Sequence, residues 1–334
     1  MKKLAVFLAT LIAVASIGFF GCSKNDNKIR LNEVTHSIFY APLYVAINNG
    51  YFADEGLEIE LTNGGGADTS MTALLSGDAD IGLMGPEAAI YVVKENSTTK
   101  PVVFGQLTKR DGSFLVGKTE NNNFEWSDLV GKTIIGGRRG GVPAMTLEYV
   151  IEEVAGLTIG TGADQVNLRT DVAFNETASV FDTTDAEFCT LFEPNASQLC
   201  TEKNYYIVES VGRASGEVPY TAFMATEKYL EKNQDKAEKF LKAVMRGYNY
   251  LKTAQPEQIA TAIAPSFSGV PTADLVKAIE QYIAIDAWMN TPVMQESAFD
   301  RLQDIMINAG ELDARLSFSS VVDNTIAQRV MESL

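Results

Sequence analysis

Residues 33–62 read EVTHSIFYAPLYVAINNGYFADEGLEIELT, and this stretch decides the fold. Residues 33–37 close an extended segment, and Pro42 suits the first turn of a helix because its φ is fixed and it lacks an N–H. Gly50, after two asparagines, fits the left-handed residue that ends a helix. Residues 57–62 then alternate apolar and polar side chains, which is the period of a strand. The stretch therefore predicts a βαβ unit.

The same unit recurs through the first two thirds of the chain. In the first half, a strand at 79–84 runs into Gly85, Pro86 opens a helix at 87–94, and another strand follows at 102–107. The second half repeats the cycle with strands at 133–136, 166–168, 187–192 and 205–209, and with helices opened by Pro143 and Pro194. Strands that alternate with helices favour parallel pairing and doubly wound sheets. Two similar halves of this kind predict an α/β protein of two lobes, each a mostly parallel sheet flanked by helices, with a cleft between them.

The predicted lobes are not contiguous in sequence. From residue 227 onward the pattern is almost entirely helical, and a strand at 220–225 is expected to return to the first lobe. We therefore expect lobe 1 to comprise residues 30–108 and 221–334, and lobe 2 residues 109–220. The hinge would be the two crossings near 106–114 and 217–223.

The N-terminus has the pattern of an export signal. Lys2 and Lys3 precede an apolar run that ends at Gly21-Cys22, which is typical of a lipoprotein signal peptide over residues 1–21 with lipidation at Cys22. An uncleaved membrane anchor is the alternative. Residues 22–29 would tether an extracytoplasmic domain to the cell membrane. In that compartment Cys189 and Cys200 could form a disulfide or remain two thiols.

Composition excludes several classes of function. The 334 residues carry a net charge of −16, which argues against nucleic acid as a partner. One histidine and no CxxC pair leave no metal-ligand pattern, and no cofactor is expected. GxSxG, HExxH and P-loop motifs are missing from the sequence, so an enzyme is not expected.

Four stretches carry a family resemblance: APLYVAINNGYFADEGLEIEL at 41–61, LLSGDADIGLMGPEAAI at 74–90, DLVGKTIIGGRRGG at 128–141 and FCTLFEPNASQL at 188–199. Together they resemble the periplasmic-type substrate-binding proteins of ABC importers for nitrate, sulfonates, bicarbonate and thiamine-precursor pyrimidines. The resemblance implies the type II periplasmic-binding-protein fold in a monomer. It also implies a small-molecule ligand that is delivered to an ABC permease and its ATPase subunit. A ligand-sensing lipoprotein, or an enzyme on the same fold such as a pyrimidine synthase, is the alternative.

Candidate binding residues lie in the loops between strands and helices. In open α/β sheets the ligand sits at the carboxyl ends of the strands, where helix N-termini offer unpaired N–H groups. The expected ligand-binding residues are Ser37, Phe39, Tyr40, Gly65, Gly66, Gly85, Glu87, Arg138, Gly140, Gly141, Phe192, Glu193, Asn195 and Tyr220. The glycines at 64–66 would serve equally well as a tight turn. Glu87 and Glu193 could also be helix-end carboxylates that gain about 0.3–1 kcal/mol from the dipole.

The combination of carboxylates and aromatic rings points to one kind of ligand. A pocket built for nitrate or a sulfonate has no reason to hold Glu87 and Glu193, because desolvated like charges repel. Stacking on flat rings and pairing with carboxylates instead suit a small planar heterocycle with N–H donors, such as an aminopyrimidine. This ligand class is the hypothesis that the sequence favours.

Overall fold

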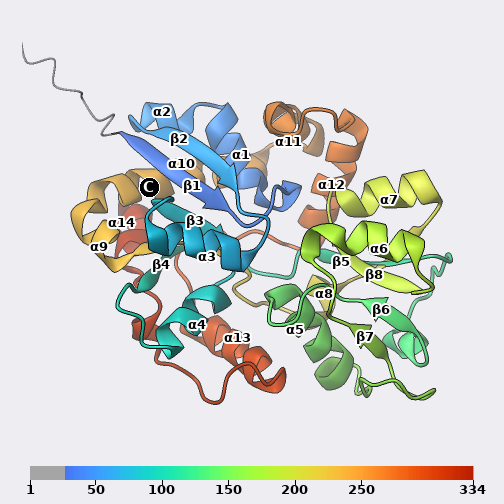
Figure 1. Ribbon diagram of the computed structural model, residues 1–334. Coiled ribbons are helices and arrows are strands. Elements are labelled where there is room, and N and C mark those ends of the chain that lie inside the picture. The colour runs from blue at the N-terminus through green and yellow to red at the C-terminus, as the bar shows by residue number, and fades with distance from the viewer. Residues whose placement is uncertain (1–26, 334) are drawn as a thin grey trace, which may run out of the picture.

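The protein consists of two lobes, each built on a five-stranded sheet covered by helices, as the computed structural model shows (Figure 1). The structure describes residues 27–333. The expected signal peptide and Cys22 lie outside this range. Within it, none of the helices combines the length and the apolar character needed to cross a membrane.

The first sheet combines the N-terminal part of the chain with one strand from much later in the sequence. Its strands, in spatial order, are β2 (Glu58–Asn63), β1 (Lys28–Glu33), β3 (Ile81–Met84), β10 (Thr221–Thr226) and β4 (Pro101–Thr108). β1 pairs in parallel with β2 and β3, whereas β10 is antiparallel to both of its neighbours. The helices of this half are α1 (Ala41–Asn48), α2 (Tyr51–Asp54), α3 (Ala67–Ser76) and α4 (Glu87–Lys94).

The second sheet repeats this arrangement. Its order is β7 (Asn167–Arg169), β6 (Thr133–Ile135), β8 (Phe188–Phe192), β5 (Ser113–Gly117) and β9 (Tyr206–Ser210), and β5 is its antiparallel strand. Its helices are α5 (Val142–Tyr149), α6 (Thr177–Thr183), α7 (Asn195–Lys203) and α8 (Val211–Ser215). The prediction of a two-lobed α/β fold is confirmed. Each sheet is mixed, because the strand that enters from the other lobe runs against the rest.

Helices from the C-terminal third complete the first lobe. They are α9 (Glu227–Lys232), α10 (Gln234–Thr253), α11 (Pro256–Ile263), α12 (Thr272–Ala284), α13 (Glu296–Asn308) and α14 (Thr325–Ser333). α10 crosses α1 so closely that a side chain at Gly247 would overlap the carbonyl oxygen of Pro42. α12 reaches lobe 2, where the Tyr282 hydroxyl accepts the Glu193 N–H at 3.0 Å. Figure 1 shows α12 between the two lobes.

Some element boundaries differ from the sequence-based expectation. β1 begins at Lys28, within the expected tether, and ends at Glu33 rather than near Ser37. Ser37 instead caps the 3-10 turn η1 (Ile38–Tyr40), because its Oγ accepts the Phe39 N–H at 3.2 Å. The helix that Pro143 opens is α-helical to Tyr149 and continues as a wider π-helical turn, η3 (Val150–Val154). Cys189 and Cys200 are free thiols.

Candidate ligand-binding site

A cavity of about 220 Å³ lies between the lobes, at the carboxyl ends of strands from both sheets. It is lined by Val34, Thr35, Tyr40, Gly65, Gly66, Ala67, Asp68, Thr69, Gly85, Glu87, Arg138, Gly141, Val142, Pro143, Ala173, Phe174, Phe192, Tyr220 and Thr221. Drug-sized ligands occupy pockets of roughly 300–1,000 Å³, so this cavity suits a smaller molecule. Its position is the one that the strand and helix order predicts.

Glu87 is a buried carboxylate in the wall of the cavity. It is the first residue of α4, and its side chain folds back over Gly85, where a Cβ would overlap the carboxylate. Burial raises the pKa of Glu87 to about 7, although backbone N–H groups, including that of Val142 in lobe 2, act in the opposite direction. Its Oε2 has no hydrogen-bond partner among the described residues. A buried acceptor without a partner costs about 1–3 kcal/mol, so a ligand donor that reaches it gains that amount.

Aromatic side chains form another part of the wall. The Phe192 ring lies 5.4 Å from Phe174 and 6.0 Å from Tyr220, and all three line the cavity. Tyr40 is also in the wall and is almost completely buried. Phe39 stands behind this layer and packs its ring 5.6 Å from that of Phe192. The wall therefore offers flat apolar faces to a ligand.

An ion pair links the two lobes beside the cavity. Arg138 of lobe 2 lies 2.9 Å from the Asp68 carboxylate at the start of α3 in lobe 1. The hydrogen bond and charge of Arg138 lower the pKa of Asp68, against a desolvation effect that acts to raise it. Both side chains are about half exposed, at 49% and 60%. The guanidinium of Arg138 is therefore paired with Asp68 but remains accessible to solvent.

Replacing Asp68 with asparagine is expected to change stability only slightly. Ion pairs between exposed groups contribute about 0–1 kcal/mol, since water screens them and both side chains lose freedom. We expect the free energy of unfolding, measured by urea denaturation, to fall by less than about 1 kcal/mol. A loss several times larger would show that this pair holds the lobes together.

Five of the expected site residues do not reach the cavity. The Ser37 Oγ donates to the Glu193 carbonyl oxygen at 2.7 Å, and Phe39 belongs to the core. The Glu193 carboxylate accepts both the N–H and the Oγ–H of Ser197, at 3.0 and 2.7 Å, so its charge stabilises the start of α7. The carbonyl oxygen of Gly140 accepts the O–H of Tyr91 from lobe 1, and Asn195 is exposed as the first residue of α7. The structure brings the remaining nine together.

Sequence reasoning missed about half of the cavity wall. The missed residues are Val34, Thr35, Ala67, Asp68, Thr69, Val142, Pro143, Ala173, Phe174 and Thr221. Most are immediate neighbours of expected residues in the same loops, so extending each loop by one or two positions would have found them. Ala173 and Phe174 follow β7, a strand of three residues whose loop the sequence did not mark as a candidate.

No group of acidic, cysteine or histidine side chains suited to a metal ion occurs within residues 27–333.

The fold and the cavity define the class of two-lobed substrate-binding proteins with the periplasmic-binding-protein fold. The chain belongs to the NMT1/THI5-like family, whose model matches residues 38–259. YtlA of Bacillus subtilis (strain 168), which is named as a binding protein, is 38% identical over 311 residues that cover 92% of each chain.

Solved structures with little sequence identity share the fold. The periplasmic aliphatic sulphonate-binding protein SsuA of Escherichia coli is 15% identical, with a TM-score of 0.66 over 87% of this chain and 95% of that one. The periplasmic nitrate-binding protein NrtA of Synechocystis PCC 6803 is 15% identical, with a TM-score of 0.68 over 92% and 89%. The desulfurization enzyme DSZB is 11% identical, with a TM-score of 0.62 over 92% and 99%. Binding proteins and an enzyme thus use this architecture.

Proposed function

We propose that the protein is the solute-binding lipoprotein of an ABC importer and that it captures a small planar heterocycle with N–H donors, such as an aminopyrimidine. The observation that carries the ligand class is the Oε2 of Glu87, which is buried in the cavity wall without a partner among the described residues. An N–H donor on the ligand would satisfy this oxygen, and the rings of Phe192 and Tyr220 would cover the ligand's faces.

The geometry gives the carboxylates different roles. Glu193 is satisfied by Ser197, and Asp68, which also lines the cavity, is paired with Arg138, so the open acceptor of Glu87 would select the ligand. An anionic ligand beside Glu87 would face an acidic group in a desolvated cavity, which disfavours nitrate and sulfonates. The ligand would then be neutral or cationic on the side that faces α4.

An alkanesulfonate or nitrate is the second candidate. It is favoured by Arg138, which lines the cavity, and by the N-terminus of α5, whose residues Val142 and Pro143 also line it. Such a ligand would have to compete with Asp68 for Arg138. It would also require Glu87 to stay protonated, which its pKa of about 7 makes inexpensive in mildly acidic solution.

Capture and delivery, rather than catalysis, is supported by the lining of the cavity. Neither Cys189 nor Cys200 lines it, and burial raises the pKa of Cys200 to about 11, so this thiol is a poor nucleophile.

We further propose that Cys22 carries the lipid anchor and that the protein acts outside the membrane as a monomer. The lobes would be residues 30–108 with 221–334 and residues 109–220, and closure around the ligand would be recognised by the permease. A ligand-sensing role without transport would use the same cavity.

A thermal-shift screen tests the ligand class directly. Residues 23–334, without the expected signal peptide and Cys22, would be heated with aminopyrimidines, flavin-like heterocycles, alkanesulfonates, nitrate and bicarbonate. A ligand at a hundred times its Kd adds about 2.7 kcal/mol, which raises Tm by several degrees for a chain of this size. We expect the largest shift with an aminopyrimidine. A shift confined to sulfonate or nitrate would leave transport standing and contradict the role of Glu87.

A further inference from the structure

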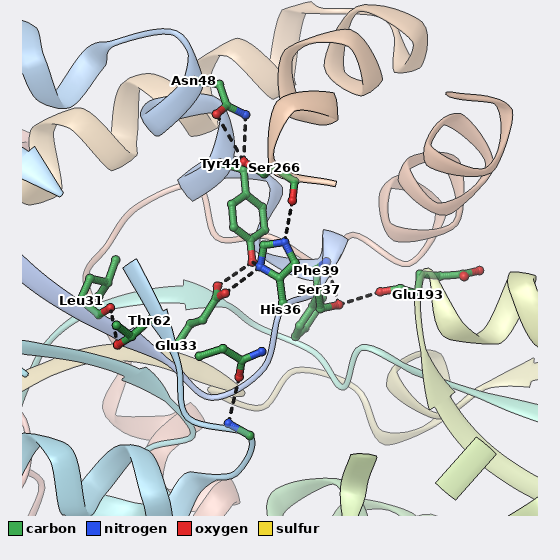
Figure 2. Close-up of polar contacts among 12 residues, drawn as sticks. Leu31, Glu33, His36, Ser37, Phe39, Tyr44, Asn48, Thr62, Glu193 and Ser266 are labelled. Carbon is green, nitrogen blue, oxygen red and sulfur yellow. Dashed lines mark hydrogen bonds and ion pairs between the residues drawn. The ribbon is translucent and has the colours of Figure 1, made fainter. Parts of the chain in front are cut away.

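The single histidine of the chain is held between two acceptors. The His36 Nδ1 lies 2.7 Å from Oε1 of Glu33, and its Nε2 lies 2.8 Å from the carbonyl oxygen of Ser266 (Figure 2). A carboxylate and a carbonyl both accept hydrogen bonds, so each ring nitrogen faces an acceptor. The Tyr44 hydroxyl lies 3.1 Å from Nδ1, but it makes its shorter bond, 2.6 Å, as a donor to the other oxygen of Glu33. An imidazole donates from both nitrogens only when it carries two protons, so the geometry favours His36 as a cation.

The partner of this cation is buried. Glu33 is only 1% exposed, and its second oxygen accepts the hydroxyl of Tyr44 at 2.6 Å. The rings of Tyr44 and Phe267 lie 5.0 and 4.7 Å from the imidazole. The groups that face His36 are thus Glu33 on β1, Tyr44 on α1 and the segment around Ser266. Glu33 is the charged group among them, and its hydrogen bond raises the pKa of His36.

The contact connects distant parts of the chain. Ser266 ends η5 (Ala264–Ser266), which follows α11, and its hydroxyl also accepts the side-chain N–H of Asn48 at 3.0 Å. His36 itself lies in the loop after β1. Val34 and Thr35 of this loop line the cavity, and Ser37 donates to lobe 2. One ring therefore lies next to both a stretch of cavity wall and a contact between the lobes; Figure 2 shows His36 together with the contact of Ser37 and Glu193.

We propose that Glu33, His36 and Tyr44 form a pH-sensitive switch that holds the loop 34–37 in its ligand-binding position and releases it when His36 becomes neutral. This inference rests on the proposed function, since it concerns the regulation of that same cavity. Neutral His36 can donate from one nitrogen only. It must then abandon either the Ser266 carbonyl oxygen or the Glu33 carboxylate, which is costly to leave buried without its cation.

The sign follows from the raised pKa of His36. The hydrogen bond to Glu33 raises it first, the Ser266 carbonyl adds to this, and burial acts in the opposite direction. The unfolded chain binds the proton with a pKa of about 6.5. The contribution to stability is therefore complete below about pH 6.5 and is lost as the pH rises through the folded-state pKa. Ligand affinity should fall in the same interval.

Three measurements test the switch. Because the chain has one histidine, nitrogen NMR of the ring gives its protonation without assignment. We expect both nitrogens to be protonated at about pH 6 and the transition to lie above the unfolded value of about 6.5. Urea unfolding between about pH 6 and pH 9 should show a loss of stability that His36→Gln does not show. Lys239→Gln, which removes an exposed cation paired with Asp235 at 2.7 Å, is the control and should follow the wild type.

The binding measurement uses 4-amino-2-methylpyrimidine as the probe. We expect its affinity for the wild type to fall about tenfold for each unit by which binding changes the pKa of His36, while His36→Gln shows no such fall. A ring nitrogen without a proton at about pH 6, or an identical change of affinity with pH in wild type and His36→Gln, would overturn the switch, because the titration of Glu87 contributes equally to both proteins and only the difference between them reports on His36. If the probe binds neither protein, the proposed ligand class fails, and the NMR and unfolding results still decide the switch.

Discussion

Replacing Gly85 with alanine is expected to weaken ligand binding by about ten- to hundredfold while the protein stays folded. The three atoms nearest to the added Cβ all belong to the carboxyl group of Glu87, which it would overlap. The carboxylate can move, so the fold survives, but Glu87 leaves the position in which its Oε2 meets the ligand. A hydrogen bond to a charged group contributes about 1.5–3 kcal/mol, which is roughly a ten- to hundredfold change in Kd. Isothermal titration of an aminopyrimidine would measure the loss.

Glu87→Gln should weaken binding by a similar factor and also flatten its pH dependence. Since burial raises the pKa of Glu87 to about 7, the wild-type carboxylate becomes a full acceptor only as the pH rises through that value. In a His36→Gln background, where the proposed switch is absent, affinity for an N–H donor should therefore increase through about pH 7, and adding Glu87→Gln should remove this increase. Glu95→Gln, just after the same helix and exposed, makes the same change of charge and serves as the control. Unchanged binding in Glu87→Gln would remove the basis of the proposed ligand class.

Replacing Gly247 with alanine should give the largest loss of stability. The new Cβ on α10 would overlap the carbonyl oxygen of Pro42 on α1, so backbone would have to move against backbone. Overpacking of this kind costs about 1–3 kcal/mol or more, which exceeds the gain of about 1 kcal/mol from replacing glycine in a helix. We expect the free energy of unfolding to fall by about 2 kcal/mol in urea denaturation. Asn249→Ala, at an exposed position of the same helix, should stay within about 0.5 kcal/mol of the wild type. An equal result for both variants would contradict the close crossing of α1 and α10.

The fold was predictable because its signals are local and repeated. Prolines mark helix starts in both halves, as at Pro42 and Pro143, and strand periodicity marks the segments between them. The side of the sheet that carries the cavity followed from the same order. The mixed character of the sheets was harder to foresee, because the direction of β5 and β10 is set by the crossings between lobes and by no pattern within either strand.

The site was predictable by loop but not by side chain. Glu87 and Glu193 both adjoin a proline at a helix start, yet one lines the cavity and the other binds Ser197. The difference depends on Ser197, a partner four residues further on whose side-chain direction only the fold reveals. The contacts of His36 are likewise only partly local. Its partners Glu33 and Tyr44 are near in sequence, but Ser266 lies more than two hundred residues away and only the fold brings it close.

The position of the late strand β10 within the first sheet has a consequence for biosynthesis. β10 lies between β3 and β4, so the N-terminal sheet lacks a central strand until residues 221–226 have been made. The second sheet uses only residues 113–210 and can form first. A chain synthesised from its N-terminus can thus complete the second sheet before the first. The facing edges of β3 and β4 therefore stay unpaired while the ribosome works through an entire lobe, so the first sheet remains in two parts during that time.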